Sequence, residues 1–212
     1  MASLWVGILC TIMSVSLSVN SAGCTPIPEI ITGDPKAGAT KTQVCASCHG
    51  VDGNGVPGMS DHPKVAGQFE KYLMKQLHDF KGPRPNGIML SFVQNLSDED
   101  IRDIAAYYAS QTMTIGVVPA AYLKLGEQIY RGGNLKTGVP ACAACHSPDG
   151  GGNALMPAPV LGGQHFEYVI AQMEAFKDGT RQNDPNGMMR DIAKRMTKEE
   201  IEAVAQYVSG LH

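Results

Sequence analysis

The sequence carries two short motifs whose residues are suited to hold a cofactor covalently. Each has two cysteines three positions apart, followed directly by a histidine: Cys45-Ala46-Ser47-Cys48-His49 and Cys142-Ala143-Ala144-Cys145-His146. This C-x-x-C-H pattern is typical of c-type haem attachment. On one helical turn the two thiols can reach the two vinyl groups of a porphyrin, while the adjacent imidazole points at the iron. We therefore expect two covalently bound haem c groups.

Three other uses of paired cysteines fit this sequence less well. A thioredoxin-like redox pair is expected within a strand–helix–strand unit, which the sequence lacks. A disulfide in an exported protein needs no following histidine. A zinc site shared by both pairs would have to bridge the 97 positions from Cys45 to Cys142, far beyond the usual spacing of zinc ribbons.

Both motifs lie within an internal repeat of about 96 to 100 residues. The segment Pro63-Lys64-Val65-Ala66-Gly67-Gln68 matches Pro159-Val160-Leu161-Gly162-Gly163-Gln164, and the two glutamines are 96 positions apart. The same offset relates Tyr72 to Tyr168, Gln76 to Gln172 and Phe80 to Phe176. A later Pro-Asn-Gly match, at 85–87 and 185–187, has an offset of 100, which indicates a short insertion around 178–184. The sequence therefore predicts two copies of one small domain.

Each copy is predicted to consist of helices joined by loops. Apolar spacing predicts middle helices over about 69–80 and 165–176, and terminal helices after Ser97 and Thr197, where a hydroxyl residue is followed three positions later by an acid. Asp34 resembles a helix N-cap, and Pro119 resembles the first residue of a helix. No alternating strand pattern competes, so the predicted fold is all-α. Loops are expected at 50–58, 82–87 and 150–152, and a linker at about 113–119.

The sixth ligand of each iron decides what a haem can do. Among eleven methionines, Met89 and Met189 occupy matching places in the repeat, each two residues after an Asn-Gly pair. We expect both to lie on loops and to ligate iron opposite His49 and His146. Met188 is a rival, but its partner in the first copy is Ile88, which cannot ligate. The methionines without a partner are interpreted as packing residues: Met59, Met74, Met113, Met156, Met173 and Met196.

Composition and charge argue against several classes of function. The chain has 17 basic and 20 acidic residues, a net charge of −3, and 17% charged residues. This balance predicts no nucleic-acid binding and no long disordered chain. We expect no catalytic residue. His62, His78 and His165 could serve a dihaem peroxidase or a gas sensor. A non-catalytic interpretation is favoured, because His78 lies on a predicted surface helix, His165 begins another helix, and His62 has no repeat partner.

The N-terminus has the features of an export signal. Residues 1–23 contain no charged side chain, and residues 4–19 are largely apolar, a length that suits the core of a signal peptide better than a membrane span. Small residues at 20–23 would suit cleavage. Two alternatives remain open: an uncleaved anchor, because the usual N-terminal basic residue is missing, and acylation of Cys24 after cleavage. We expect an exported, periplasmic protein with possible membrane attachment.

The motifs, their order and the segments that follow them resemble the dihaem cytochrome c4 family over residues 34–212. The resemblance implies two tandem class I cytochrome c domains, here residues 24–117 and 118–212 after a signal peptide at 1–23, related by a pseudo-twofold axis with the haem propionates near their interface. It also implies axial pairs His49–Met89 and His146–Met189.

The resemblance further assigns the carbonyls of Pro63 and Pro159 to hold the ligating imidazoles. It implies an electron carrier that receives electrons from a quinol-oxidising complex and delivers them to a membrane terminal oxidase. An electron-transfer subunit of a catalytic complex is the main alternative, and a peroxidase-like enzyme is a further one.

Overall fold

The computed structural model describes residues 32–84 and 86–212. Residues 32–212 form one compact unit. Its regular elements are helices, and two antiparallel bridges, Asn134 with Val139 and Asn153 with Ala158, are isolated pairs outside any strand. The all-α prediction is therefore confirmed for the part of the chain that is described. The predicted signal peptide, Cys24 and Pro85 lie outside the described residues.

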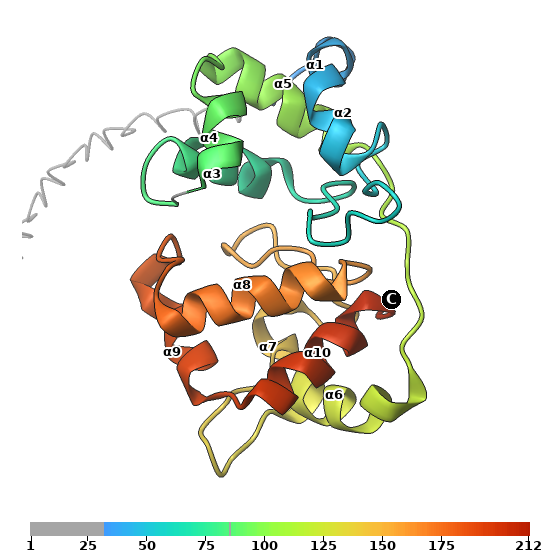
Figure 1. Cartoon of the computed structure of the whole chain (residues 1–212), viewed down its shortest axis with the longest axis vertical. Helices are drawn as coiled ribbons and strands as arrows, with labels where there is room; N and C mark the ends of the chain where they lie inside the picture. The colour runs from blue at the N-terminus through green and yellow to red at the C-terminus, as the bar shows by residue number, and fades with distance from the viewer. Residues whose placement is uncertain (1–31, 85) are drawn as a thin grey trace, which may run out of the picture. The chain divides into compact units, whose positions relative to one another are not determined.

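Two groups of helices follow one another along the chain (Figure 1). We call residues 32–117 the N-lobe and residues 118–212 the C-lobe. The N-lobe contains α1 (Pro35–Lys41), α2 (Gln43–His49), α3 (Glu70–Phe80), α4 (Gly87–Val93) and α5 (Asp98–Ala109). The C-lobe contains α6 (Ala120–Gly132), α7 (Ala143–His146), α8 (Phe166–Asp178), the short 3-10 helix η1 (Pro185–Gly187), α9 (Met188–Arg195) and α10 (Lys198–Ser209). Residues 112–119 form no helix, as the predicted linker requires.

The helix termini follow from local sequence. Asp34 caps α1 by accepting a hydrogen bond from the Lys36 amide, and the predicted capping boxes of Ser97 with Asp100 and Thr197 with Glu200 are both formed. Pro119 is the residue before α6 rather than its first residue, so that expectation was off by one position. Its fixed φ still directs the chain into the helix.

In each lobe the first helix crosses the last, and a glycine lies at the contact. Gly38 of α1 faces α5 near Tyr107, and Gly126 of α6 faces α10 near Tyr207. The C-lobe core lies around the second crossing, with Tyr130 fully buried among apolar side chains. These crossings hold each terminal helix beside the start of its lobe, because any larger side chain would separate the backbones.

We predict that Gly126→Ala destabilises the holoprotein by about 1–3 kcal/mol, because overpacking forces a well-packed contact apart. The added Cβ would clash with the Ala203 carbonyl and lie 2.5 Å from the Cβ of Tyr207. Gly132→Ala, in the same helix with no atom near the added methyl, is the matched control and should change stability by less than about 1 kcal/mol. Thermal unfolding measures both variants, and equal stabilities would contradict the packing argument.

Candidate functional site

Each cysteine motif places its histidine at the end of a short helix and against a proline carbonyl. His49 is the last residue of α2 and His146 the last of α7, and each residue is only 8% exposed. The Nδ1 of His49 lies 2.8 Å from the carbonyl oxygen of Pro63, and the Nδ1 of His146 lies 2.9 Å from that of Pro159. A carbonyl only accepts, so Nδ1 carries the proton in both rings. The Nε2 lone pair is thereby left for a metal.

The burial of these groups also sets their protonation. Burial lowers the pKa of His49 and of His146, although the bond to the proline carbonyl opposes this effect. Both imidazoles are therefore neutral at neutral pH, as a metal ligand must be. Burial raises the pKa of Cys45, and raises that of Cys142 to about 11. Neither thiol has the depressed pKa of a reactive redox cysteine.

The cysteine pairs, histidines and candidate methionines all line one apolar cavity of about 680 Å³. Among residues 32–84 and 86–212, no three His, Cys, Asp or Glu side chains converge as a metal-binding group, so the two cysteine pairs do not form a common zinc site. None of the four cysteines in the two motifs forms a disulfide. The arrangement is an apolar chamber with two separate motifs, each presenting two cysteines and one neutral imidazole.

The structure places Met89 and Met189 on helices, so the expectation that both lie on loops was wrong. Met89 is the third residue of α4, whose first turn is capped by the side chain of Asn86 bonding to the Met89 amide at 3.0 Å. Met189 is the second residue of α9, which begins after Asn186 and Gly187 adopt left-handed backbone conformations. The Asn-Gly pair therefore starts a helix in both copies instead of extending a loop.

The remaining methionines divide into two groups. Met74, Met173 and Met196 pack against or within the buried clusters, as predicted. Met156 is 41% exposed and lines the cavity, as Met173 and Met196 also do, so its interpretation as a packing residue stays a prediction. Met188 is also 41% exposed, and Ile88, its repeat partner, is 64% exposed.

Of the three histidines considered for catalysis, only His78 lies plainly at the surface, beside Asp98. His62 lines the cavity, with its ring centroid 6.4 Å from that of His49 and its Nδ1 bonded to Asp61 at 2.8 Å. His165 precedes α8 and has a buried Nε2 packed close to Gly55. The absence of catalytic residues stays a prediction.

Two buried arginines line the same cavity, and the sequence reasoning assigned them no role. Arg84 is 8% and Arg181 is 7% exposed. Arg84 donates to Gln76, Tyr168 and Gln172, and Arg181 donates to Tyr72, Gln76, Gln172 and Asn183, at distances of 2.8–3.2 Å. In the described part of the chain neither guanidinium forms an ion pair with a carboxylate.

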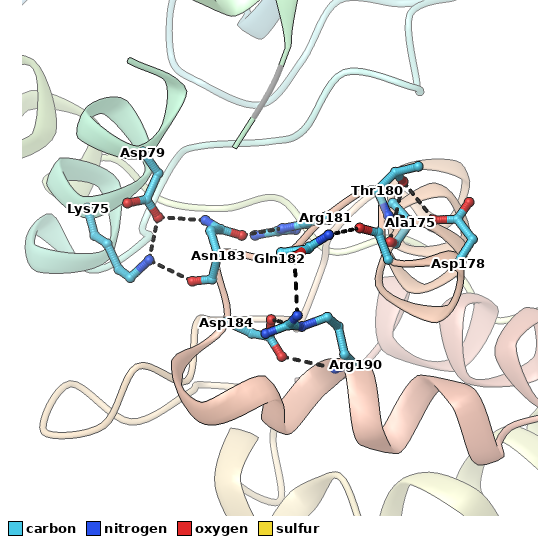
Figure 2. A network of polar contacts seen from close by, with 11 residues as sticks. Lys75, Asp79, Ala175, Asp178, Thr180, Arg181, Gln182, Asn183, Asp184 and Arg190 are labelled. Carbon is cyan, nitrogen blue, oxygen red and sulfur yellow. Dashed lines mark hydrogen bonds and ion pairs between the residues drawn. The ribbon is translucent and has the colours of Figure 1, made fainter. Parts of the chain in front are cut away.

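The predicted insertion holds one of these arginines in place (Figure 2). After α8 ends at Asp178, the Arg181 amide bonds back to the Ala175 carbonyl at 2.9 Å, and Asp184 pairs with Arg190 at 2.8 Å. Between these anchors, Asn183 reaches the N-lobe and donates to Asp79 at 2.6 Å. Asp79 in turn bonds to Lys75, which also donates to the Asn183 carbonyl.

The chemistry of this lining fits haem. Buried positive charges are costly without a counter-charge, and a haem carries two propionate carboxylates beside a large apolar ring. Burial raises the pKa of Tyr168, but the positive charges of Arg84 and Arg181 outweigh it and hold that pKa below its ordinary value. The positive potential in the cavity therefore suits anionic propionates. The repeated polar residues at the 96-residue offset were the sequence signal for this cluster.

Comparison with known proteins identifies the family. The family model described as Cytochrome c matches residues 36–112 and again residues 123–212. The cytochrome c4 of Pseudomonas aeruginosa is 46% identical over 182 residues, covering 85% of this chain and 90% of that protein. The chain belongs to the cytochrome c4 family. It is accordingly a dihaem c-type cytochrome that carries electrons, with one haem c attached at Cys45 and Cys48 and the other at Cys142 and Cys145.

Two further cytochrome relatives bear on fold and role. The crystal structure of reduced recombinant cytochrome c4 from Pseudomonas stutzeri has a TM-score of 0.81 and 44% identity, covering 85% of this chain and all of that one. This match confirms two tandem cytochrome c domains. The thiosulfate dehydrogenase electron acceptor of Stutzerimonas stutzeri is 38% identical over 172 residues, covering 79% of this chain and 78% of that protein. The exact boundary at 117/118 stays a prediction.

The buried cluster predicts a redox effect. We expect Arg84→Gln to lower both reduction potentials, because a nearby cation favours the electron-rich ferrous state, with a free-energy change on the order of 1 kcal/mol. Spectroelectrochemical titration measures the change. The exposed Lys124→Gln in α6 is the control and should leave both potentials in place. Unchanged or raised potentials in Arg84→Gln would contradict this account of the cluster.

Proposed function

We propose that this cytochrome is an exported, periplasmic carrier in which His49 and Met89 ligate the first iron and His146 and Met189 ligate the second, and that it delivers electrons to a terminal oxidase. One observation carries the proposal. Each lobe presents one buried imidazole, oriented by a proline carbonyl, and one methionine from the matching repeat position to the same cavity.

The ligand set accounts for electron transfer without substrate chemistry. A bound haem supplies an iron that alternates between ferric and ferrous states, and thioether ligation favours the ferrous state. Pro63 and Pro159 hold the imidazole rings in one orientation, so both oxidation states meet the same geometry. The apolar walls would exclude water from a bound haem, and ligation by Met89 and Met189 would leave no coordination position open for a substrate. A peroxidase-like reaction would require one of these faces to be open.

Export is supported by the uncharged, apolar N-terminal segment and by covalent cofactor attachment. Residues 1–31 lie outside the described part of the chain, and none of the described helices is long and apolar enough to cross a membrane. Mass spectrometry of the mature protein distinguishes cleavage near residues 22–24, acylation of Cys24 and an intact N-terminus. An intact, unmodified N-terminus on a protein recovered from the cytoplasm would contradict export.

The cavity opens through apolar rims on which redox partners can dock. In the N-lobe the rim residues Val44, Ile88 and Phe92 are 57%, 64% and 43% exposed. In the C-lobe the rim residues Met156 and Met188 are each 41% exposed. A second partner is favoured by the relative named thiosulfate dehydrogenase electron acceptor. This chain would then receive electrons from a thiosulfate-oxidising enzyme, as the electron-transfer component of a catalytic system, with a quinol-oxidising complex as the other donor.

Met89→Ala and Met189→Ala test the ligand assignment. Each variant should lose about half of the weak long-wavelength absorption that marks thioether ligation of ferric haem, because one iron in each loses its sulfur. The double variant should lose the band entirely. Met156→Ala is the control, since Met156 lines the cavity but has no repeat partner, and it should retain the full band. Loss of about half of the band in Met156→Ala, together with its full retention in Met189→Ala, would reassign the second ligand.

Ile88→Asp tests docking through the N-lobe rim. We expect this variant to reduce the rate of electron transfer to oxidase-containing membranes about tenfold, because a charge on the apolar contact must be desolvated. The wild-type rate should depend only weakly on salt. Leu135→Asp is the control: Leu135 is 96% exposed but does not line the cavity. A strong salt dependence would contradict an apolar contact. Reduction by thiosulfate dehydrogenase, without oxidation by the membranes, would favour the second partner.

A further inference from the structure

Two buried glutamines connect the lobes in a reciprocal way. Gln164 of the C-lobe donates to the Lys64 carbonyl at 2.9 Å and accepts from the Lys64 amide at 2.8 Å. Gln68 of the N-lobe makes the same pair of bonds to Val160, at 3.1 and 3.0 Å. Both glutamines are 5% exposed or less. Each side-chain amide therefore binds one backbone residue of the other lobe as a neighbouring β-strand would.

The orientation of both amides is determined by a second donor. The Oε1 of Gln164 also accepts from the amide of His165 at 3.0 Å, and the Oε1 of Gln68 from that of Phe69 at 3.1 Å. Two backbone N–H groups donate to each Oε1. If the amide were flipped, its NH₂ group would point at these two N–H donors and no hydrogen bond could form there. The acceptor end of each glutamine thus points at the backbone N–H of the other lobe.

The two residues that the glutamines bind, Lys64 and Val160, directly follow Pro63 and Pro159. The amide of Lys64 and the carbonyl of Pro63 belong to a single planar peptide group. An unbroken hydrogen-bonded chain therefore runs from His49 Nδ1 to the Pro63 carbonyl, across that peptide, and from the Lys64 amide to Gln164. The equivalent chain runs from His146 through the peptide between Pro159 and Val160 to Gln68.

Hydrogen bonds at the two ends of a peptide strengthen one another. A peptide N–H that donates makes its carbonyl a better acceptor, by about 10–30% per bond in condensed-phase estimates. A stronger acceptor at the proline draws more of the Nδ1 proton and makes the imidazole a more basic ligand. A more basic ligand stabilises ferric iron and lowers the reduction potential.

We infer that Gln68 and Gln164 are positioning residues that tune the haem of the opposite lobe: Gln164 acts on the first haem through His49, and Gln68 acts on the second haem through His146. The inference rests on the proposed ligation by these two histidines. The reciprocal contacts imply that each haem acquires its final potential only when the other lobe is docked.

Packing beside the glutamines keeps the connection rigid. The ring of His165 lies against Gly55 and that of Phe69 against Gly152, and a side chain at either glycine would collide with the ring. The Gly55 and Gly152 amides bond to the carbonyls of His49 and His146 at 2.7 and 2.9 Å. Each lobe thus contacts the loop that follows the other lobe's cysteine motif twice, once through a glutamine side-chain amide and once through a ring.

Gln164→Leu and Gln68→Leu form the test, read by NMR of the ferrous protein and by potentiometric titration of each haem. In Gln164→Leu the Nδ1–H resonance of His49 should move upfield. The ferric-to-ferrous ratio of the first haem should fall about twofold or more at fixed ambient potential, while the second haem stays unchanged. Gln68→Leu should show the same changes at His146 and the second haem only.

Gln164→Glu separates tuning from loosening of the interface. The carboxylate still accepts from the Lys64 amide but cannot donate to its carbonyl, so the first-haem potential should stay at or below the wild-type value, opposite to Gln164→Leu. Gln164→Asn, whose amide is one carbon shorter, replaces the leucine variant if that variant does not fold. The inference would be overturned if each leucine variant changed the reduction potential of the haem in its own lobe. It would also be overturned if each variant changed both potentials equally or changed neither. Missing haem-shifted Nδ1–H resonances in the wild type would instead refute the proposed ligation itself.

Discussion

The structure depends on one hydrogen bond that occurs in each lobe, between a buried imidazole Nδ1–H and a proline carbonyl. A buried histidine needs a partner, and a carbonyl partner on Nδ1 determines the tautomer that leaves Nε2 free to bind iron. The cysteine motif positions the histidine of this hydrogen bond, and the loop after the motif positions the proline carbonyl. The loop stays close to the histidine because the amides of Gly55 and Gly152 bond to the carbonyls of His49 and His146.

Duplication of this unit creates properties that a single lobe lacks. Two buried guanidinium groups, Arg84 and Arg181, share the neutral acceptors Gln76 and Gln172 across the contact between lobes. Their unbalanced charge suits the propionates of two haems in one chamber. The same contact carries the glutamine pairs that reach the proline peptides. The lobes therefore form one electrostatic and hydrogen-bonded system, consistent with an electron carrier of the cytochrome c4 family.

Much of the fold and the site could be predicted because the signals are local or repeated. Cysteine spacing within one helical turn, capping boxes at Ser97 and Thr197, and the alignment of Met89 with Met189 require no knowledge of distant contacts. The error about the two methionines is also local. An Asn-Gly pair is compatible with a loop or with the start of a helix, and only the cap formed by Asn86 and the left-handed turn at Asn186 decide between them. The repeat marks the polar residues Gln68, Gln76, Gln164 and Gln172, but it does not reveal the bonds between the copies. Those bonds, including the ones made by Arg84 and Arg181, join residues 84 to 109 positions apart.

Carbon monoxide uptake by the intact ferrous protein is the most direct test of the claim that an imidazole and a thioether close both irons. The account predicts that the Soret and visible bands of both haems stay unchanged under carbon monoxide at neutral pH without denaturant. A carbonyl spectrum forming rapidly at either haem would show an open coordination position, and the protein would then have to be regarded as a catalyst or a gas sensor.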